Sequence, residues 1–149
     1  MKEKEIVEIW NTIIGKYHEA KNGTLKAEEL IVFRVFSFII NMEMNGVSGA
    51  IYNLTSNLGA NRKWNDLRAT AEAVAKIGDN RSAQMLLDAA DTFENLSEPI
   101  AAVWDEIMKS ATSQLSEDYW ETLEACIPNI YDALEMYTAE NLLNNDLNE

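Results

Sequence analysis

The amino-acid sequence predicts an all-α, single-domain protein, a bundle of about seven to eight helices around a buried central helix. Apolar residues recur at spacings of three and four along most of the 149 residues, and no segment alternates convincingly with a period of two. The hydrophobic share of 47% is ordinary for a globular protein. No proline- or glycine-rich linker and no repeat divides the chain, so one domain is expected over residues 1–149.

The central helix is expected at Leu25–Met44. It contains the apolar run Leu30–Ile40, which only Arg34 and Ser37 interrupt. This run is longer than a typical strand of about 5–6 residues and shorter than the about 20 residues that span a bilayer. A helix that is apolar nearly all round is a buried one. The residues expected in one core are Leu30, Phe33, Phe36, Ile40 and Ile51.

The segments on either side of the central helix are also expected to be helical. Glu3–Ala20 has apolar residues at helical spacing and is predicted to form the first helix. Asn22-Gly23 is expected to end it, and Thr24 to act as the N-cap of the central helix. Asn45-Gly46 then provides a left-handed stop, and a short helix with apolar residues at 51–58 follows.

The remaining helices are predicted from capping residues and prolines. A helix over residues 64–75 ends at Gly78, and Asp79 caps a helix with its buried stripe at residues 83–93. Pro99 starts a helix that buries residues 100–107.

Ser116 starts a further helix, buried through Trp120 and Leu123. Pro128 starts the last one, and residues 141–149 are expected to fray. The tryptophans, which are expected to anchor the core, are Trp10, Trp64, Trp104 and Trp120.

The charge of the chain is strongly negative and unevenly distributed. Twelve basic and 25 acidic side chains give a net charge of −13. Residues 1–75 hold nine of each sign, whereas residues 76–149 hold sixteen acidic side chains and only Lys76, Arg81 and Lys109 as cations. Because phosphate contacts require a basic surface, we expect no direct binding to nucleic acid or to an anionic membrane. The acidic half suits a basic protein as partner.

The carboxylates at helical spacing in this half form what we call the acidic face. Its predicted members are Asp88, Asp91, Glu117, Glu121, Glu124, Asp132 and Glu135. Like charges this close weaken a helix by about 0.2–0.5 kcal/mol per pair. A soluble, self-repelling surface is the usual explanation, but few cations balance this one. Rows of carboxylates can also imitate the phosphates of DNA.

Residues that carry chemistry are scarce. His18 falls in the last turn of the first helix, where the helix dipole favours its charged form, and Cys126 is expected to be a small buried residue. One histidine and one cysteine cannot form a zinc cage, and no Walker or Rossmann glycine pattern occurs. We therefore expect no enzymatic activity, no metal and no cofactor. The single cysteine and the charged start of the chain, without a signal-peptide pattern, favour a cytoplasmic protein.

Asparagines flank the junction that follows the central helix. Capping and turn formation explain such residues by default. A polar ligand pocket is the sharper alternative, and its candidate residues are Asn41, Asn45, Tyr52 and Asn53.

One part of the chain resembles a known family. Its pattern is Glu43, the Asn45-Gly46 turn, Tyr52-Asn53, a helix AEAVAKIG at 71–78 that ends in Ile-Gly, and a helix AQMLLDAADTF at 83–93 that ends in Phe. In this order, residues 28–96 resemble the DNA-mimic-like family of small, acidic, all-helical bacterial proteins, most of which have no assigned function. Val47 and Ala50 stand where the family has a glycine and a glutamine. The resemblance implies a helical fold and, for the characterised kind, binding to DNA-binding proteins in place of DNA.

Three functions remain as hypotheses. The first is a protein-interaction module whose acidic half occupies a basic, nucleic-acid-binding surface; regular carboxylate rows on a convex face would favour it. The second is an immunity-type inhibitor of a toxin. The third is an enzyme or a small-ligand protein that uses the Asn-Gly junction; a deep pocket there would favour it. The oligomeric state stays open, a homodimer included.

Overall fold

The computed structural model describes residues 2–20, 25–54, 65–94, 115 and 118–143. These residues form helices and turns without a strand, which confirms the all-α fold class. The described part holds six α-helices, and the helix expected at residues 100–107 lies outside it. The elements are α1 (Lys2–Ala20), α2 (Ala27–Asn53), α3 (Asn65–Lys76), α4 (Asn80–Glu94), α6 (Tyr119–Ala125), α7 (Ile127–Thr138) and a π-helical turn, η3 (Ala139–Leu143).

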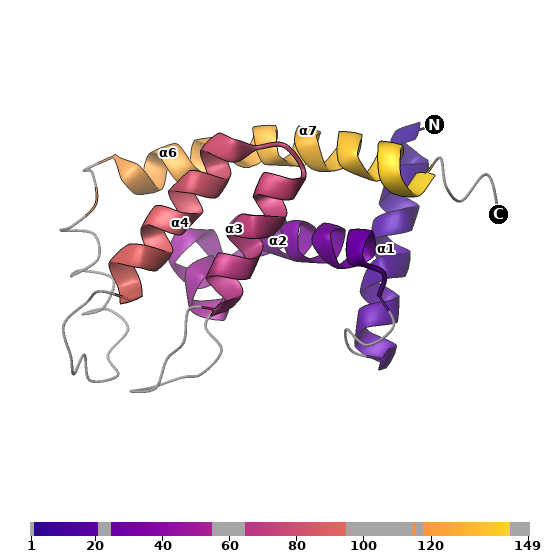
Figure 1. Ribbon diagram of the computed structural model, residues 1–149, viewed down its shortest axis with the longest axis horizontal. Coiled ribbons are helices and arrows are strands. Elements are labelled where there is room, and N and C mark those ends of the chain that lie inside the picture. Colours follow the sequence, from indigo (N-terminus) through magenta and orange to yellow (C-terminus); the bar gives the residue numbers. More distant parts are fainter. Residues whose placement is uncertain (1, 21–24, 55–64, 95–114, 116–117, 144–149) are drawn as a thin grey trace.

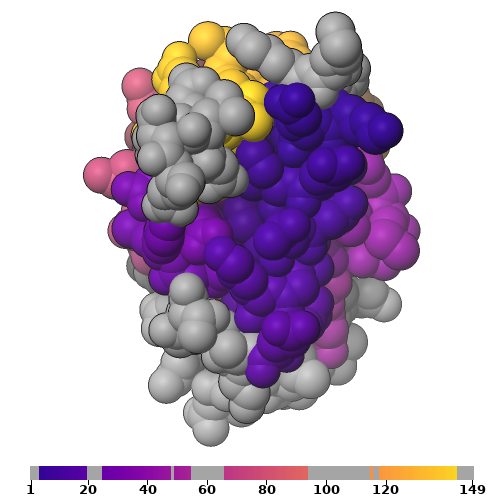
Figure 2. Space-filling model, turned by 90° about the vertical axis from the view of Figure 1, so that its right-hand side faces the viewer, coloured from indigo at the N-terminus to yellow at the C-terminus, as the bar shows by residue number. Residues whose placement is uncertain are grey.

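The helix α2 is the one around which the others are arranged (Figure 1). α3 packs along α4 and against α2, and α7 packs along another side of α2. α6 and α7 run nearly in line across the top of the view, and α1 crosses near the start of α2. Figure 2 shows α1, in indigo, covering this side of the molecule, with the yellow end of the chain beside the end where α1 begins. The prediction of a central helix is confirmed.

The buried side of α2 differs from the predicted one. Of the five residues expected in the core, only Ile51 is fully buried. The core residues of this helix are Val32, Val35, Phe38, Ile39, Met42, Ala50 and Ile51. Leu30, Phe33, Phe36 and Ile40 are only partly buried. Phe33 and Phe36 still pack against the core, so the prediction holds in part for these two, whereas it was wrong for Leu30 and Ile40. A run that is apolar nearly all round does not indicate which side its neighbours cover.

Phe33 and Phe36, the two partly buried phenylalanines of this helix, both contact α1. The ring of Phe33 stacks on Tyr17, with 3.9 Å between ring centroids. The ring of Phe36 lies against Trp10, with 4.9 Å between centroids. Trp10 itself is buried, and its Nε1–H donates to the Thr138 hydroxyl at 2.9 Å. The prediction that Trp10 anchors the core is confirmed, and its hydrogen bond joins α1 to α7.

The other predicted tryptophan anchors have different outcomes. Trp120 is half-buried near Phe93, and the buried residues of α6 are Tyr119 and Leu123. Trp120, which was predicted to be buried, is only partly buried, although it packs against the core; α6 turns its neighbour Tyr119 towards α4 instead. Trp64 and Trp104 lie outside the described residues.

Gly46 breaks α2, as the Asn45-Gly46 pair predicted. Its φ is 72° and its ψ is −178°, while the residues on both sides are helical. The positive φ was expected, but the extended ψ differs from the left-handed helical stop that was predicted. The chain therefore kinks and resumes a helix at once, and this short second part ends at Asn53. Residues 55–58, expected to extend it, lie outside the described part.

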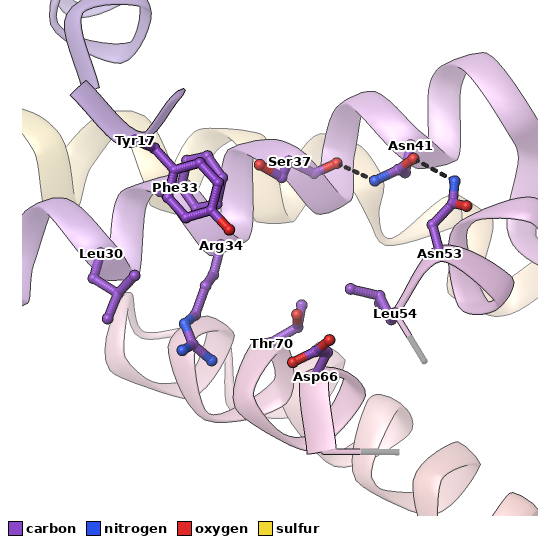
Figure 3. Close-up of a pocket in the computed structure, with 10 residues that line it drawn as sticks. All are labelled: Tyr17, Leu30, Phe33, Arg34, Ser37, Asn41, Asn53, Leu54, Asp66 and Thr70. Atoms are coloured by element: carbon purple, nitrogen blue, oxygen red, sulfur yellow. Dashed lines mark hydrogen bonds between the residues drawn. The ribbon is translucent and has the colours of Figure 1, made fainter. Parts of the chain in front are cut away.

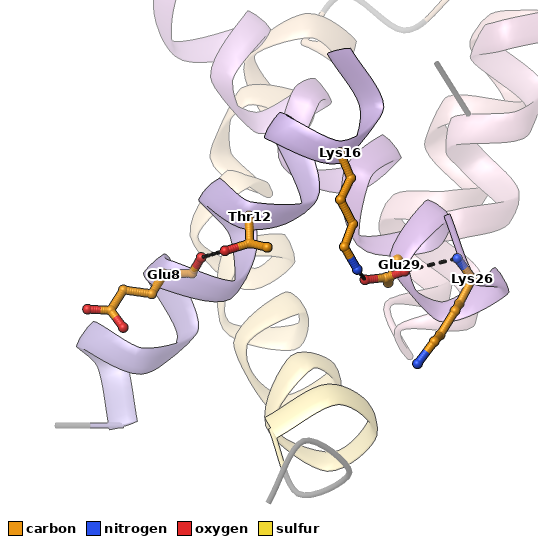
Figure 4. A network of polar contacts seen from close by, with 5 residues as sticks. All are labelled: Glu8, Thr12, Lys16, Lys26 and Glu29. Carbon is orange, nitrogen blue, oxygen red and sulfur yellow. Dashed lines mark hydrogen bonds and ion pairs between the residues drawn. The ribbon is translucent and has the colours of Figure 1, made fainter. Parts of the chain in front are cut away.

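An ion pair at the start of α2 ties it to α1 (Figure 4). The Lys16 ammonium lies 2.8 Å from Oε2 of Glu29, and Oε1 of Glu29 accepts the backbone N–H of Lys26 at 3.0 Å. Burial works to raise the pKa of Glu29, but the bonds from Lys16 and Lys26 outweigh it and leave the pKa below the ordinary value of 4.5. The N-cap of α2 is Lys26, so the helix begins two residues later than predicted, and Thr24 lies outside the described residues.

The later helix starts follow the predicted signals. Asp79 caps α4, because its carboxylate accepts the backbone N–H of Ser82 at 3.1 Å and the Ser82 hydroxyl at 2.7 Å. Pro128 lies in the first turn of α7. Residues 141–143, which were expected to fray, instead complete η3, and Leu142 is buried.

By length and composition alone, one stretch of the described chain could cross a membrane. This stretch is Ala27–Val47. It is longer than the run Leu30–Ile40, which the sequence analysis judged too short to span a bilayer. A soluble protein's core helix meets the same test. In the most apolar window of this stretch, 28% of the residues are buried inside the fold, Val35 and Phe38 among them.

Candidate functional site

α6, α7 and η3 form one nearly continuous rod with a buried inner side (Figure 1). Cys126 is both the C-cap of α6 and the N-cap of α7, and its φ of −77° and ψ of −15° are close to helical, so the chain bends little there. The buried residues of the rod recur at three or four positions: Tyr119, Leu123, Cys126, Ile130, Leu134, Thr138 and Leu142. One such stripe leaves the opposite side of the rod to solvent.

The predicted carboxylates of the rod lie largely on this solvent side. Glu121 and Glu124 on α6 and Asp132 on α7 are exposed. Glu135 is partly buried and has an interaction partner. Glu117 lies outside the described residues.

Two carboxylates on the rod were missed by the sequence prediction. Asp118 directly precedes α6, and Glu140 lies in η3; both are exposed. Asp118 stands three residues before Glu121, and Glu140 eight residues after Asp132, so helical spacing places each on the same side as a predicted member. That spacing was the available signal. We include both in the acidic face from here on.

The two predicted carboxylates of α4 have different surroundings. Asp88 is exposed and close to α6: burial, and after it the charge of Asp88, raises the pKa of Tyr119. The hydroxyl of Tyr119 donates to the backbone carbonyl of Met85, which fixes α6 against α4. Asp91, three residues after Asp88, instead pairs with Arg68 of α3 at 2.5 Å. The acidic face therefore joins Asp88 to the rod, whereas Asp91 lies beside a cation.

The acidic half of the chain supplies few cations of its own. Within the described part of residues 76–149, the basic residues are Lys76 and Arg81, both exposed. Arg81 lines a shallow hollow of about 240 Å³ between α4 and α6, together with Asp118 and Glu121. No ion pair among the described residues joins Arg81 to either carboxylate.

The asparagine junction forms a hydrogen-bonded cluster. Oδ1 of Asn41 accepts from Nδ2 of Asn45 at 3.2 Å and from Nδ2 of Asn53 at 3.0 Å, and Nδ2 of Asn41 donates to the Ser37 carbonyl. The bond from Asn53 crosses the kink at Gly46 and holds its two sides together, whereas the other two bonds lie before the kink. Asn41 and Asn53 also line a cavity between α2 and α3, whereas Asn45 and Tyr52 are not among its lining residues.

The residues considered for catalysis or metal binding lie apart. His18 is exposed in the last turn of α1, as predicted. Cys126 is buried, also as predicted, with its Sγ 3.9 Å from the Met85 sulfur. Among the described residues there is no group of three or more histidine, cysteine, aspartate or glutamate side chains that could hold a metal ion.

Comparison with known families gives one result. A family model described as DMP19-like protein matches residues 23–141, which is most of the chain. The chain belongs to the DMP19-like protein family. The match covers the α3–α4 helix pair and the α6–α7 rod, and so extends well beyond the region where the sequence resemblance was noted. Comparison with curated proteins finds no match, and comparison with solved structures finds none.

Proposed function

We propose that this DMP19-like protein is an acidic interaction module that binds the basic surface of a nucleic-acid-binding protein and competes there with DNA or RNA. The observation that carries the proposal is the exposed acidic side of the α6–α7–η3 rod, whose exposed carboxylates form no ion pair among the described residues. A surface of one sign attracts a partner of the opposite sign and speeds the encounter between them.

The spacing of charges on the rod indicates how many phosphates it could replace. Asp118, Glu121, Glu124, Asp132 and Glu140 are exposed along the rod. At about 1.5 Å per residue, they extend over roughly 33 Å, with an average spacing of roughly 8 Å between neighbouring charges. Duplex DNA carries one charge per about 1.7 Å of its axis, and one strand one per about 3.4 Å. The rod would thus stand in for a few phosphates of one strand, and the partner would use a few lysines or arginines to bind it.

The test begins with the partner. The protein is immobilised to capture its partner from cells, and the purified partner is then offered a labelled DNA or RNA duplex with and without this protein. We expect the protein to displace the nucleic acid. Binding should weaken steeply as salt rises, because exposed charges are screened over about 8–10 Å near physiological ionic strength.

A charge-reversal variant locates the binding surface. In Glu121→Lys/Glu124→Lys/Asp132→Lys, the three exposed carboxylates of the rod are reversed. The matched control reverses Glu5 and Glu8 of α1 and Glu72 of α3, which are exposed as well. The rod variant should associate about tenfold or more slowly with the partner at low salt, and the control should change little. Both should melt close to the wild-type temperature, since none of the six side chains is buried.

Two results would rule the proposal out. One is a partner that binds equally well at high salt. The other is a partner that holds the nucleic acid and this protein together. If a toxin without bound nucleic acid is captured and inhibited through the rod, the proposal fails in favour of an immunity-type inhibitor.

A further inference from the structure

A second feature of the fold, separate from the acidic face, is the cavity between α2 and α3 (Figure 3). Its volume is about 240 Å³, and Tyr17 of α1 closes one side. Sites for drug-sized ligands measure roughly 300–1,000 Å³. The cavity is therefore suited to a smaller molecule, about the size of an amino acid.

Several polar groups of the cavity have no hydrogen-bond or ion-pair partner in the part of the chain that the structure describes. Arg34 is partly buried and Thr70 is 2% exposed. Within the described part of the chain, no hydrogen bond or ion pair engages the Arg34 guanidinium or the hydroxyls of Ser37 and Thr70. Asp66, which lines the cavity as well, forms no ion pair there either. Ser37 is partly buried like Arg34, and Asp66 is exposed at the mouth of the cavity. Buried polar groups in folded proteins are nearly always paired, so the unpaired Thr70 hydroxyl, with the unpaired guanidinium lining the same cavity, points to an external partner.

The cavity is lined by two residues of opposite charge, Arg34 and Asp66, that form no ion pair with each other. In Figure 3, Arg34 extends from α2 towards α3, and Asp66 and Thr70 extend from α3 into the space between the helices. A guanidinium binds a carboxylate through two parallel N–H bonds. A carboxylate binds an ammonium, and Oδ1 of Asn53, whose Nδ2 is engaged with Asn41, offers a further acceptor.

The rest of the wall is apolar. The stacked rings of Tyr17 and Phe33 form one part, and Leu30 and Leu54 form others. A ligand that satisfies the whole cavity thus needs a negative group, a positive group and a short apolar body. A dianionic phosphate would be repelled by Asp66, and a purely apolar molecule would leave the guanidinium unpaired.

We infer that this cavity binds a free α-amino acid with an apolar side chain. Arg34 would hold the ligand carboxylate, Asp66 and the Asn53 carbonyl would hold its ammonium, and the Tyr17–Phe33 stack would cover its side chain. This is a binding function, independent of the acidic face and of any protein partner.

The first test uses the wild-type protein and three probes. L-leucine, 4-methylpentanoate (which lacks the ammonium) and 3-methylbutylamine (which lacks the carboxylate) are titrated into ¹⁵N-labelled protein and followed by NMR. We expect L-leucine to shift the amide signals of residues 34, 37 and 70, and each analogue to bind about tenfold or more weakly. No binding of L-leucine or L-phenylalanine up to about 10 mM, or equal binding of all three probes, would overturn the inference.

The second test removes one charge at a time. Arg34→Gln and Asp66→Asn should each weaken L-leucine binding by about tenfold or more while the protein stays folded. Matched controls are Arg81→Gln, at the other hollow, and Glu72→Gln, exposed on the same helix as Asp66. Unchanged affinity in either cavity variant would contradict the proposed contacts. If Arg34→Gln does not fold, the comparison of the three probes on the wild-type protein decides alone.

Discussion

The ion pair between α1 and α2 gives a stability prediction with a defined pH dependence. Glu29 is 7% exposed and bonds to Lys16 at 2.8 Å and to the Lys26 N–H at 3.0 Å. Replacing it by glutamine keeps the size and one acceptor but removes the charge. A hydrogen bond to a charged group contributes about 1.5–3 kcal/mol and a neutral one about 0.5–1.5 kcal/mol, so Glu29→Gln should lower the free energy of unfolding by about 1–2 kcal/mol near neutral pH.

The sign of the pH dependence follows from the lowered pKa. Because the pKa of Glu29 is lower in the folded chain than its ordinary value of 4.5, the unfolded chain binds the proton more readily. The stabilisation is complete above the ordinary pKa and is lost as the pH falls through the folded one. The difference between wild type and Glu29→Gln should therefore be constant near neutral pH and should shrink as the pH falls below the ordinary pKa of 4.5.

Urea unfolding followed by far-UV circular dichroism, repeated from about pH 7 to about pH 3, measures this difference. Because wild type and Glu29→Gln are compared at the same pH, the effect that protonating the other carboxylates has on the free energy of unfolding cancels. The control is Glu8→Gln on α1, an exposed carboxylate whose backbone carbonyl, not its side chain, bonds to Thr12. A Glu29→Gln difference that persists unchanged at acidic pH, or one no larger than that of the control, would refute the reasoning.

Two more predictions concern the central helix. Phe38→Ala should lower the free energy of unfolding by about 3–5 kcal/mol because Phe38 is fully buried, whereas Phe36→Ala, at a partly buried ring against Trp10, should cost about 1–2 kcal/mol. Chemical denaturation of both variants measures the two losses. A larger loss for Phe36→Ala than for Phe38→Ala would mean that α2 buries the side that carries Phe36. Gly46→Ala should destabilise the protein by about 1–3 kcal/mol, since a Cβ there meets no atom within 4 Å but the positive φ with extended ψ strains any other residue. A more stable Gly46→Ala protein would mean that α2 runs through Gly46 as an ordinary helix, where alanine is favoured by about 1 kcal/mol.

Helix identity could be predicted from the sequence because its signals are local. The proline in the first turn of α7, the carboxylate cap of Asp79 and the break at Gly46 each act within a few residues of themselves. The buried side of α2 could not be predicted in this way, because the helices that pack on it, α1, α3 and α7, include segments far away in the sequence. An apolar face on every side leaves the choice to tertiary packing. The cavity around Arg34 depends on the same packing, and the sequence pointed only to its asparagine edge.

The acidic face shows how far charge in a sequence and charge on a surface can differ. Asp88 and Asp91 are three residues apart on one helix, so spacing alone placed them together. In the structure Asp91 pairs with Arg68, a cation from the electrically neutral half of the chain, whereas Asp88 lies beside α6. Lys16 is likewise occupied with Glu29, within that half. The surface that a basic partner would meet is therefore set by which carboxylates the fold leaves without a cation, and along the α6–α7–η3 rod these are the ones facing solvent.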